Sequence, residues 1–224
     1  MTSAAVSGLV LAGGRSRRLG IDKTTMAWPP APRAGEPIPS AGEAQRAAPV
    51  HPAVARQTLL LATAGKLAAV CDEVLLVGFR GTPGAPYKAV PDLYPEGGSL
   101  GGIYAGLYAA QHNVAIAVAT DMPFLSVRLL RWMLSLPRDY DVLVPVREEP
   151  EPLHAIYTKA CLEPMRLRLE GGRLKITGFF EDVRVRYLEA AVLTRLDPQG
   201  HSFFNINTPE DLERARAILA QSSG

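Results

Sequence analysis

Short apolar runs rich in β-branched residues alternate along the chain with longer segments in which apolar residues recur every three or four positions. The short runs predict strands at residues 6–11, 73–77, 88–90, 114–119 and 141–146. The longer segments predict helices at residues 54–67, 100–111, 127–136, 159–169 and 210–219. This alternation is typical of an α/β fold whose sheet is mostly parallel.

The last helix has the clearest start signal. Thr208 suits the N-cap position, Pro209 suits the first helical position, and Glu210 and Asp211 place acids in the first turn. We therefore expect this helix to begin directly after Thr208.

A segment at about 29–52 breaks the pattern, because Pro, Ala, Gly and Glu dominate it and neither apolar period persists. A helical pattern resumes after it, which indicates a loop insertion within a domain. Since 224 residues suit one α/β unit, we expect residues 1–224 to form a single domain.

Composition narrows the class of protein. The formal net charge is only +2, which gives no basic surface for nucleic acid or an anionic membrane. No apolar run approaches the length of a membrane span, and the amino terminus lacks the basic flank of a secretion signal, so we expect a cytoplasmic location. Cys71 and Cys161 lack metal or redox spacing, and we expect both to be structural.

The candidate chemistry begins in the loop after the first strand. Gly13 and Gly14 follow the strand directly, and a basic cluster that includes Arg18 and Lys23 follows them. Glycines let backbone N–H groups approach an anion, and basic side chains neutralise it, so this loop is expected to bind a polyphosphate. It is neither a Walker A loop nor a dinucleotide fingerprint, because its glycine and lysine spacing differs from both.

A single carboxylate, Asp121, follows the buried strand at 114–119, where ligands of open parallel sheets bind. A carboxylate there suits Mg²⁺, which binds one or two carboxylates together with substrate phosphates. The other interpretation is that Asp121 only caps the helix that begins near Ser126.

Residues 11–23 resemble the LAGGxSxRMGxDK signature of molybdenum cofactor guanylyltransferases, with Leu19 in place of Met. The resemblance implies a fold of the nucleotide-diphospho-sugar transferase type, a single-domain Rossmann-like three-layer sandwich with a mostly parallel sheet. It implies that Lys23, Arg18 and Asp121 are catalytic, with Asp121 as the metal ligand. It also implies a nucleotide site made of Leu11, Ala12, Gly13, Gly14, Lys23, Asp92 and Asp121.

Two further features bear on the nucleotide. Gly13 stands where similar cytidylyltransferases carry Ala, which implies GTP as the preferred nucleotide. Asp92 matches an aspartate that the family uses near the guanine and ribose, although Asp is also common in surface turns. Downstream of it, Ser99 replaces the Pro of the family's GPLGG motif, and Gly101 and Gly102 are expected to allow close packing over the nucleotide.

Residues 203–212, FFNINTPEDL, resemble the family's NxNTPEDL motif. The resemblance implies that Asn205 and Asn207 bind the acceptor or face the nucleotide, and we expect them to alternate on one side of a strand. The other interpretation is that the two asparagines only support the N-cap of the last helix.

Residues 151–157, EPLHAIY, are similar to the family's QPLxAxY strand, which borders the acceptor pocket, but Glu151 replaces Gln. Its negative charge is unfavourable beside a phosphate unless Arg147, Arg173 or Lys175 offsets it. We expect His154 to be a packed strand residue, because no paired carboxylate or nucleophile accompanies it.

The resemblance implies transfer of GMP from GTP to the terminal phosphate of molybdopterin, with Mg²⁺ and release of pyrophosphate. Expected partners are GTP, molybdopterin, and proteins that deliver molybdopterin or mature molybdoenzymes. One alternative is a related nucleotidyltransferase that uses CTP with molybdopterin, or an NTP with a sugar phosphate or other small phosphate. The second alternative is a nucleotide-binding protein without catalysis.

Overall fold

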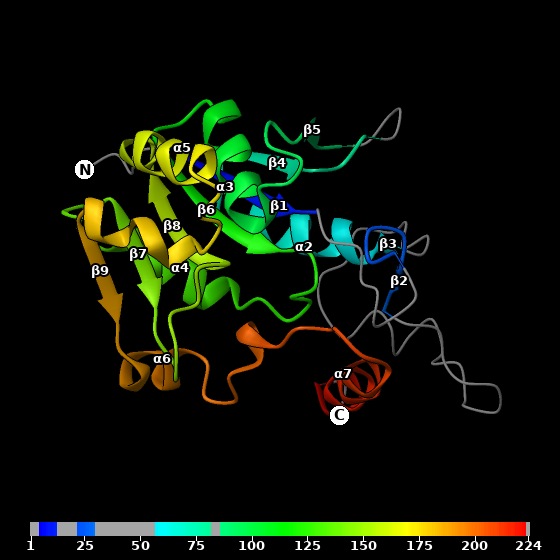
Figure 1. Cartoon of the computed structure of the whole chain (residues 1–224). Helices are drawn as coiled ribbons and strands as arrows, with labels where there is room; N and C mark the ends of the chain where they lie inside the picture. Colours follow the sequence, from blue (N-terminus) through cyan, green and yellow to red (C-terminus); the bar gives the residue numbers. More distant parts are fainter. Residues whose placement is uncertain (1–4, 13–21, 30–56, 82–85, 223–224) are drawn as a thin grey trace.

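The computed structural model describes residues 5–12, 22–29, 57–81 and 86–222 (Figure 1). In this part of the chain the largest sheet has seven strands in the order β5-β4-β1-β6-β8-β7-β9. The strands are β1 (Val6–Leu11), β4 (Glu73–Val77), β5 (Lys88–Val90), β6 (Val114–Ala119), β7 (Val142–Pro145), β8 (His154–Thr158) and β9 (Val185–Leu188). A short antiparallel pair, β2 (Ala27–Trp28) and β3 (Gln57–Thr58), lies apart from that sheet.

The sheet is mostly parallel, as the sequence predicts. β5, β4, β1 and β6 pair in parallel, and β7 pairs in parallel with β9. β8 runs antiparallel to both of its neighbours, β6 and β7. All five residues of β8 are buried, because the strand lies inside the sheet and both of its faces are covered.

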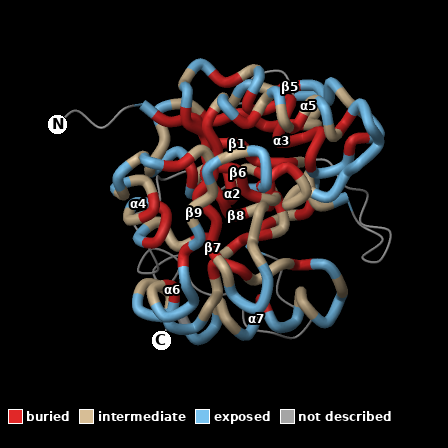
Figure 2. Tube along the Cα trace, turned by 60° about the vertical axis from the view of Figure 1, so that its left-hand side comes forward, coloured by how far each residue is buried: buried red, intermediate tan, exposed pale blue. Residues whose placement is uncertain are grey.

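Helices cover both faces of the sheet. They are α2 (Leu59–Ala68), α3 (Gly98–Ala109), α4 (Val127–Ser135), α5 (Leu162–Glu170), α6 (Ala190–Leu196) and α7 (Pro209–Ser222), with 3₁₀ turns η1 (Lys159–Cys161), η2 (Ile176–Asp182) and η3 (His201–Phe203). Successive residues of β1 point to opposite faces, so Leu9 packs with α3 and α5 while Val10 packs with α2 and α4. The predicted three-layer sandwich is confirmed, and Figure 2 shows the buried residues concentrated in its central strands.

Several element boundaries differ from the sequence predictions. The helix predicted at 54–67 begins at Leu59, because residues Gln57–Thr58 form β3 and the Thr58 hydroxyl accepts a hydrogen bond from the Leu61 amide at 3.3 Å. Residues 54–56 lie outside the described part. The helix predicted at 159–169 opens with the 3₁₀ turn η1. β9 was not predicted, because this edge strand is short and only partly buried.

The start of α7 agrees with its sequence signal. The Thr208 hydroxyl accepts a hydrogen bond from the Asp211 amide at 3.2 Å, and an Asp211 carboxylate oxygen accepts one from the Thr208 amide at 3.0 Å. This reciprocal pair is a capping box in which Asp takes the place of Glu. The helix therefore begins at Pro209, directly after its cap.

Other sequence expectations can be placed only in part. Beyond Pro29, the insertion at 29–52 lies outside the described residues. Cys71 and Cys161 are both free, and Cys161 is buried, in agreement with structural roles. Within the described residues, the helices are too short or too polar to cross a membrane.

Candidate functional site

The site lies where the strand order reverses. From β1 the chain builds β4 and β5 on one side, and then returns to add β6 on the other side of β1. Open α/β sheets bind ligands at the carboxyl ends of such strands. Here these ends are joined by Thr120, whose hydroxyl and amide both donate to the carbonyl oxygen of Leu11, at 2.8 and 3.2 Å.

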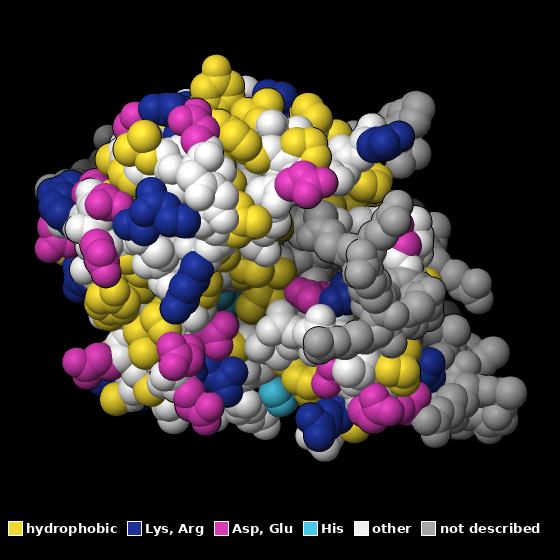
Figure 3. Space-filling model, viewed as in Figure 1, with side chains coloured by type: hydrophobic (Ala, Val, Ile, Leu, Met, Phe, Trp, Pro, Cys, Tyr) yellow, Lys and Arg dark blue, Asp and Glu magenta, His cyan; other side chains and the backbone are white. Residues whose placement is uncertain are grey.

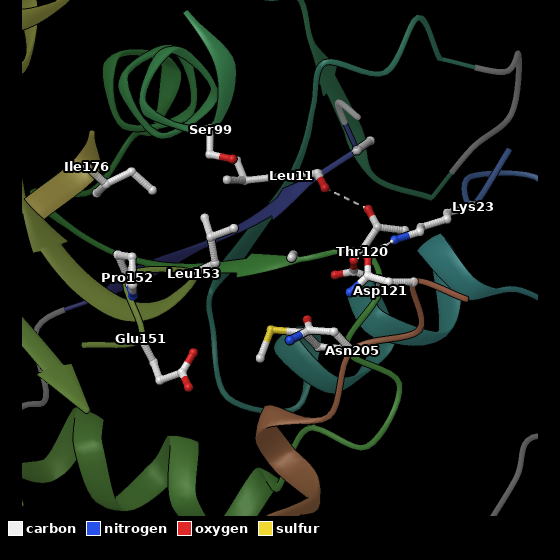
Figure 4. A pocket seen from close by; sticks show the side chains of 14 residues that line it. Leu11, Lys23, Ser99, Thr120, Asp121, Glu151, Pro152, Leu153, Ile176 and Asn205 are labelled. Carbon is white, nitrogen blue, oxygen red and sulfur yellow. Dashed lines mark hydrogen bonds and ion pairs between the residues drawn. The ribbon is translucent and has the colours of Figure 1, made fainter. Parts of the chain in front are cut away.

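A cavity of about 360 Å³ opens at this edge (Figure 4). Its volume is within the range of small-molecule sites. It is lined by residues from the ends of β1 and β6, the turn before β2, the starts of α3 and η2, and the segments before β8 and α7. They are Leu11, Ala12, Lys23, Ser99, Ala119, Thr120, Asp121, Met122, Glu151, Pro152, Leu153, Ile176, Asn205 and Asn207. Figure 3 shows the surface hollowed near the middle of the view, with acidic and basic side chains next to each other in the hollow.

Three polar side chains meet at one end of the cavity. The ammonium nitrogen of Lys23 lies 2.7 Å from Oδ2 of Asp121 and 2.8 Å from Oδ1 of Asn207. The side chains of Lys23 and Asp121 are only 13% and 16% exposed, so their attraction is weakly screened by solvent. Oδ1 of Asp121 is buried and has no hydrogen-bond partner among the described residues.

The chain around Lys23 is fixed on both sides. Before it, the Asp22 carboxylate accepts hydrogen bonds from the amide and the hydroxyl of Thr24, which closes a tight turn. After it, Met26 and Trp28 are buried against the start of α2 and against Ile206, and the Met26 carbonyl accepts the Leu59 amide at 2.8 Å. The lysine is thereby held at the cavity.

Asp121 does not cap α4, so that interpretation is wrong. The hydroxyl of Ser126 caps the helix by accepting a hydrogen bond from the Leu129 amide at 3.2 Å. The Asp121 carboxylate turns to Lys23, and its backbone carbonyl accepts the Ile206 amide at 3.0 Å. The Asp121 carboxylate therefore takes no part in capping α4.

A divalent cation could be held at Asp121, whose Oδ1 has no hydrogen-bond partner in the described part of the chain. Among the residues that the structure describes, no cluster of three or more His, Cys, Asp and Glu side chains is arranged to bind a metal ion. A cation here would therefore need oxygen atoms from a bound ligand and from water. That is the usual arrangement for Mg²⁺, which is held by one or two carboxylates together with phosphates.

Asn205 and Asn207 both line the cavity, but the strand expected to carry them is absent. Ile206 makes one backbone bond to Asp121 beyond the end of β6, and no ladder extends from it. The Ile206 side chain is buried in the core, whereas Asn205 and Asn207 on either side of it line the cavity. The Asn207 amide donates to the Asp211 carboxylate at 3.0 Å, so Asn207 supports the α7 cap with its backbone and contacts Lys23 with its side chain.

Glu151 lines the cavity from the turn before β8. Burial raises the pKa of its carboxyl, and the nearby Arg147 guanidinium opposes that rise. Nη1 of Arg147 lies 3.9 Å from Oε1 of Glu151, so Arg147 supplies the offsetting charge that the sequence called for. The same guanidinium lies 5.5 Å from the centre of the Phe203 ring.

His154 is fully buried on β8, and burial lowers its pKa to about 4. Its ring centre lies 4.6 Å from that of Phe203. The expectation of a packed strand histidine is confirmed.

Some predicted site residues are not brought to the cavity. Asp92 lies in the exposed turn after β5 and does not line it. Gly13, Gly14 and Arg18 lie outside the described residues.

Gly101 and Gly102 of α3 pack closely against other residues of the protein. A Cβ at Gly101 would lie 3.0 Å from the Tyr94 carbonyl oxygen, and one at Gly102 would lie 3.4 Å from Leu11. Ser99, one turn earlier, lines the cavity.

Sequence reasoning missed Thr120 and Ile176. Thr120 adjoins Asp121, and its place at the end of a buried strand was a usable signal. Ile176 lies in the irregular segment between α5 and β9, and it reaches the cavity only because η2 folds back toward the turn before β8. No local pattern indicates that contact.

The sequence is similar to a known family over most of its length. Residues 8–185 match the family model described as MobA-like NTP transferase domain. A probable molybdenum cofactor guanylyltransferase of Pelotomaculum thermopropionicum is 34% identical over 220 residues, which cover 97% of this chain and 94% of that protein. The molybdenum cofactor guanylyltransferase of Desulfosudis oleivorans is 33% identical over 219 residues, which cover 96% of each protein.

The structure is also similar to a solved one. The molybdopterin-guanine dinucleotide biosynthesis protein A of Archaeoglobus fulgidus superposes with a TM-score of 0.73 and is 26% identical. The match covers 96% of this chain and 99% of that chain.

Proposed function

Since this chain belongs to the MobA-like NTP transferase family and is a nucleotidyltransferase, we propose that it transfers GMP from GTP to molybdopterin. An oxygen of the terminal phosphate of molybdopterin forms a bond with the α-phosphorus of GTP. The bond from the α-phosphorus to the bridging oxygen breaks, and pyrophosphate leaves with the electron pair. Two full-length relatives named as guanylyltransferases support this choice of reaction.

The observation that carries the proposal is the contact of Lys23 with Asp121 and Asn207 at the carboxyl ends of β1 and β6. The ammonium group is placed to neutralise phosphate charge at the strand ends, where a nucleotide would bind. Asn207 and Asp121 fix the direction of that group. The two oxygens together orient a flexible side chain that would otherwise sample many rotamers.

This chemistry requires no general base from the protein. A phosphate monoester has a second pKa of about 6, so the attacking oxygen is already largely ionised at neutral pH. The task of the residues is to position the two substrates and to balance their negative charge. Lys23 supplies positive charge, while Asn205 and Asn207 supply amide groups that can hydrogen-bond to an acceptor.

We further propose Mg²⁺ as the cofactor. Oδ1 of Asp121, which has no hydrogen-bond partner among the described residues, would hold it together with phosphate oxygens of the nucleotide. When bound, the ion would withdraw charge from the phosphates as pyrophosphate leaves.

The proposal is tested by incubating the purified protein with Mg²⁺, each of the four NTPs, and either molybdopterin or a panel of sugar phosphates and other small phosphates. Release of pyrophosphate is followed in each pair. We expect release with GTP and molybdopterin, and formation of the guanine dinucleotide product.

Faster release with CTP, or with another phosphate acceptor, would reassign the substrate within the family. Tight binding of GTP with no release from any pair would show a nucleotide-binding protein without catalysis.

A further inference from the structure

The polar residues at the Lys23 end of the cavity come from three separate segments of irregular chain. Lys23 lies in the turn before β2, Asp121 lies in the turn after β6, and Asn207 lies in the segment before α7. Figure 4 shows Lys23 beside Asp121. Since the three residues share neither a helix nor a strand, regular secondary structure does not explain how their segments are held together.

Hydrogen bonds account for only part of the arrangement. The Asp121 carbonyl accepts the Ile206 amide at 3.0 Å, which ties the Asp121 turn to the segment before α7. In the described part of the chain, residues 22–28 are joined to these two segments only by the two hydrogen bonds that the Lys23 ammonium group itself donates. The proposed function requires that group to bind phosphate, so its own bonds cannot be what fixes its turn.

Three aromatic side chains supply the missing contact. Trp28 ends β2 and is 7% exposed, Phe124 lies in the loop between β6 and α4, and Phe204 lies just before Asn205. The ring centre of Phe124 is 5.6 Å from that of Trp28, with the two planes at 73°, and 5.8 Å from that of Phe204, with the planes at 59°. Aromatic rings attract each other in such tilted arrangements. Phe124 thus joins all three segments through one side chain.

We propose that Phe124 is a positioning residue, which packs against Trp28 and thereby keeps the Lys23 ammonium group at the phosphates during the transfer. Phe124 is not among the residues that line the cavity, so it acts through Lys23 and does not touch a substrate. This inference rests on the proposed function, which gives Lys23 its role. A displacement of about 1 Å near the reacting atoms can lower a rate about 100-fold, so the packing of one ring can control turnover.

The test compares two substitutions that each remove one ring. Phe124→Leu keeps an apolar side chain at the junction of the three segments. Phe180→Leu is the matched control, because Phe180 makes a similar edge-on contact with Phe179, at 5.2 Å and 86°, and does not line the cavity. It belongs to the core on the face of the sheet that α3 and α5 cover. Urea unfolding measures the stability of both variants, and all assays are run at a temperature at which both are folded.

We expect Phe124→Leu to lower kcat for pyrophosphate release from GTP and molybdopterin about tenfold, and to leave KM for GTP within about twofold. Phe180→Leu should keep kcat within about twofold of the unmodified protein. In the Lys23→Met protein, the addition of Phe124→Leu should cause no further loss, because the ring acts through the lysine. A further tenfold loss in that double variant, or an equal fall of kcat in Phe124→Leu and Phe180→Leu, would overturn the proposal.

A second measurement follows Lys23 without turnover. Each protein reacts with the N-hydroxysuccinimide ester of acetic acid, and mass spectrometry compares the acetylation rate of Lys23 with that of the exposed Lys66 in the same sample. The Lys23 side chain is only 13% exposed, so it should react slowly in the unmodified protein and in Phe180→Leu. We expect it to react about tenfold faster in Phe124→Leu, because local opening of its turn becomes easier. An unchanged acetylation rate in Phe124→Leu would overturn the proposal.

The two measurements distinguish failure of the positioning role from failure of the proposed function. If the unmodified protein releases no pyrophosphate from GTP and molybdopterin, the proposed function fails, and the acetylation rates still show whether Phe124 holds Lys23. If release occurs and the acetylation rate does not change in Phe124→Leu, the positioning role alone is wrong.

Discussion

The ammonium group of Lys23 lies 2.7 Å from the carboxylate of Asp121, although 98 positions separate the two residues in the chain. Each comes from a loop at the carboxyl edge of the sheet, and each side chain is mostly shielded from solvent. The pair gives the cavity one fixed positive group and one carboxylate oxygen, Oδ1 of Asp121, that has no partner among the residues the structure describes.

Lys23→Met removes the ammonium group and keeps much of the side-chain volume. We expect the rate of pyrophosphate release to fall about 10²–10³-fold, because one preorganised electrostatic contact to the phosphates is lost. Lys66→Met, at an exposed position near the end of α2, is the matched control and should be neutral. Near-normal release by Lys23→Met would remove this residue from the catalytic assignment, and thermal unfolding of each variant would reveal any loss of fold.

Asp121→Asn keeps the shape of the side chain and an oxygen that can accept from Lys23, but it removes the negative charge. We expect Mg²⁺-dependent release of pyrophosphate to fall at least about 100-fold, since a neutral amide is a poor ligand for Mg²⁺. The rate is measured over a titration of Mg²⁺. Asp139→Asn, which changes an exposed acid paired with Arg186, serves as the control. Equal Mg²⁺ dependence in the two variants would contradict a metal at Asp121.

Gly106→Ala tests the packing of α3 on the sheet. A Cβ at Gly106 would lie 2.9 Å from Cγ2 of Val77 and 3.0 Å from Cδ1 of Leu9, so either the helix or these buried side chains must shift. We expect the free energy of unfolding to fall by about 1–2 kcal/mol, after part of the overpacking cost is offset by the better helix propensity of Ala.

Gly65→Ala is its control within α2, because the nearest atom to the added Cβ is Nε2 of Gln57 at 3.9 Å. There we expect a gain of about 0.5–1 kcal/mol. Urea unfolding measures the stability of both variants. If Gly65→Ala were also destabilised, crowding of the added Cβ would not explain the loss of stability in Gly106→Ala.

His154→Phe should make the fold less sensitive to mild acid. Burial lowers the pKa of His154 from 6.5 to about 4, so the unfolded chain binds a proton in this pH range that the folded chain does not. The stability that comes from keeping His154 neutral is complete above pH 6.5, and it is lost as the pH falls toward 4. At pH 5 the loss is about 2 kcal/mol.

We therefore expect the unmodified protein to lose about 2 kcal/mol more than His154→Phe between pH 7.5 and pH 5. Urea midpoints at the two pH values give the comparison. Phe is chosen because the histidine ring already packs on Phe203. Identical pH dependence of the two proteins would mean that His154 is not held neutral by burial.

Much of the fold could be predicted from the sequence, because it depends on local patterns. β6 is apolar over its whole length, and β1 and β4 are apolar apart from Ser7 and Glu73, as is typical of strands covered on both faces. The start of α7 was marked by Thr208 and Pro209, whose preferences act within a single turn. The family was recognisable from residues 11–23, and a match over residues 8–185 confirms it.

The candidate site could be predicted only as separate parts. Lys23, Asp121 and Asn207 were each named from their own motifs, and the structure brings their side chains into contact. A strand was expected at Asn205 and Asn207, but these described residues form none, and a single backbone hydrogen bond joins Ile206 to Asp121 beyond the end of β6. Asp92 was expected near the nucleotide; it lies in an exposed turn and is not among the residues that line the cavity.

The sequence by itself thus determined which segments form strands and helices, which family the chain resembles, and which residue types are available for phosphate chemistry. The tertiary structure alone decided that β8 runs antiparallel inside the sheet, that Ile176 reaches the cavity, and that Lys23 meets Asp121 across 98 positions. The physical reason is the distance along the chain over which each effect acts. Propensity and apolar periodicity act over a few residues, whereas a contact between distant residues depends on strand order and on the packing of whole elements.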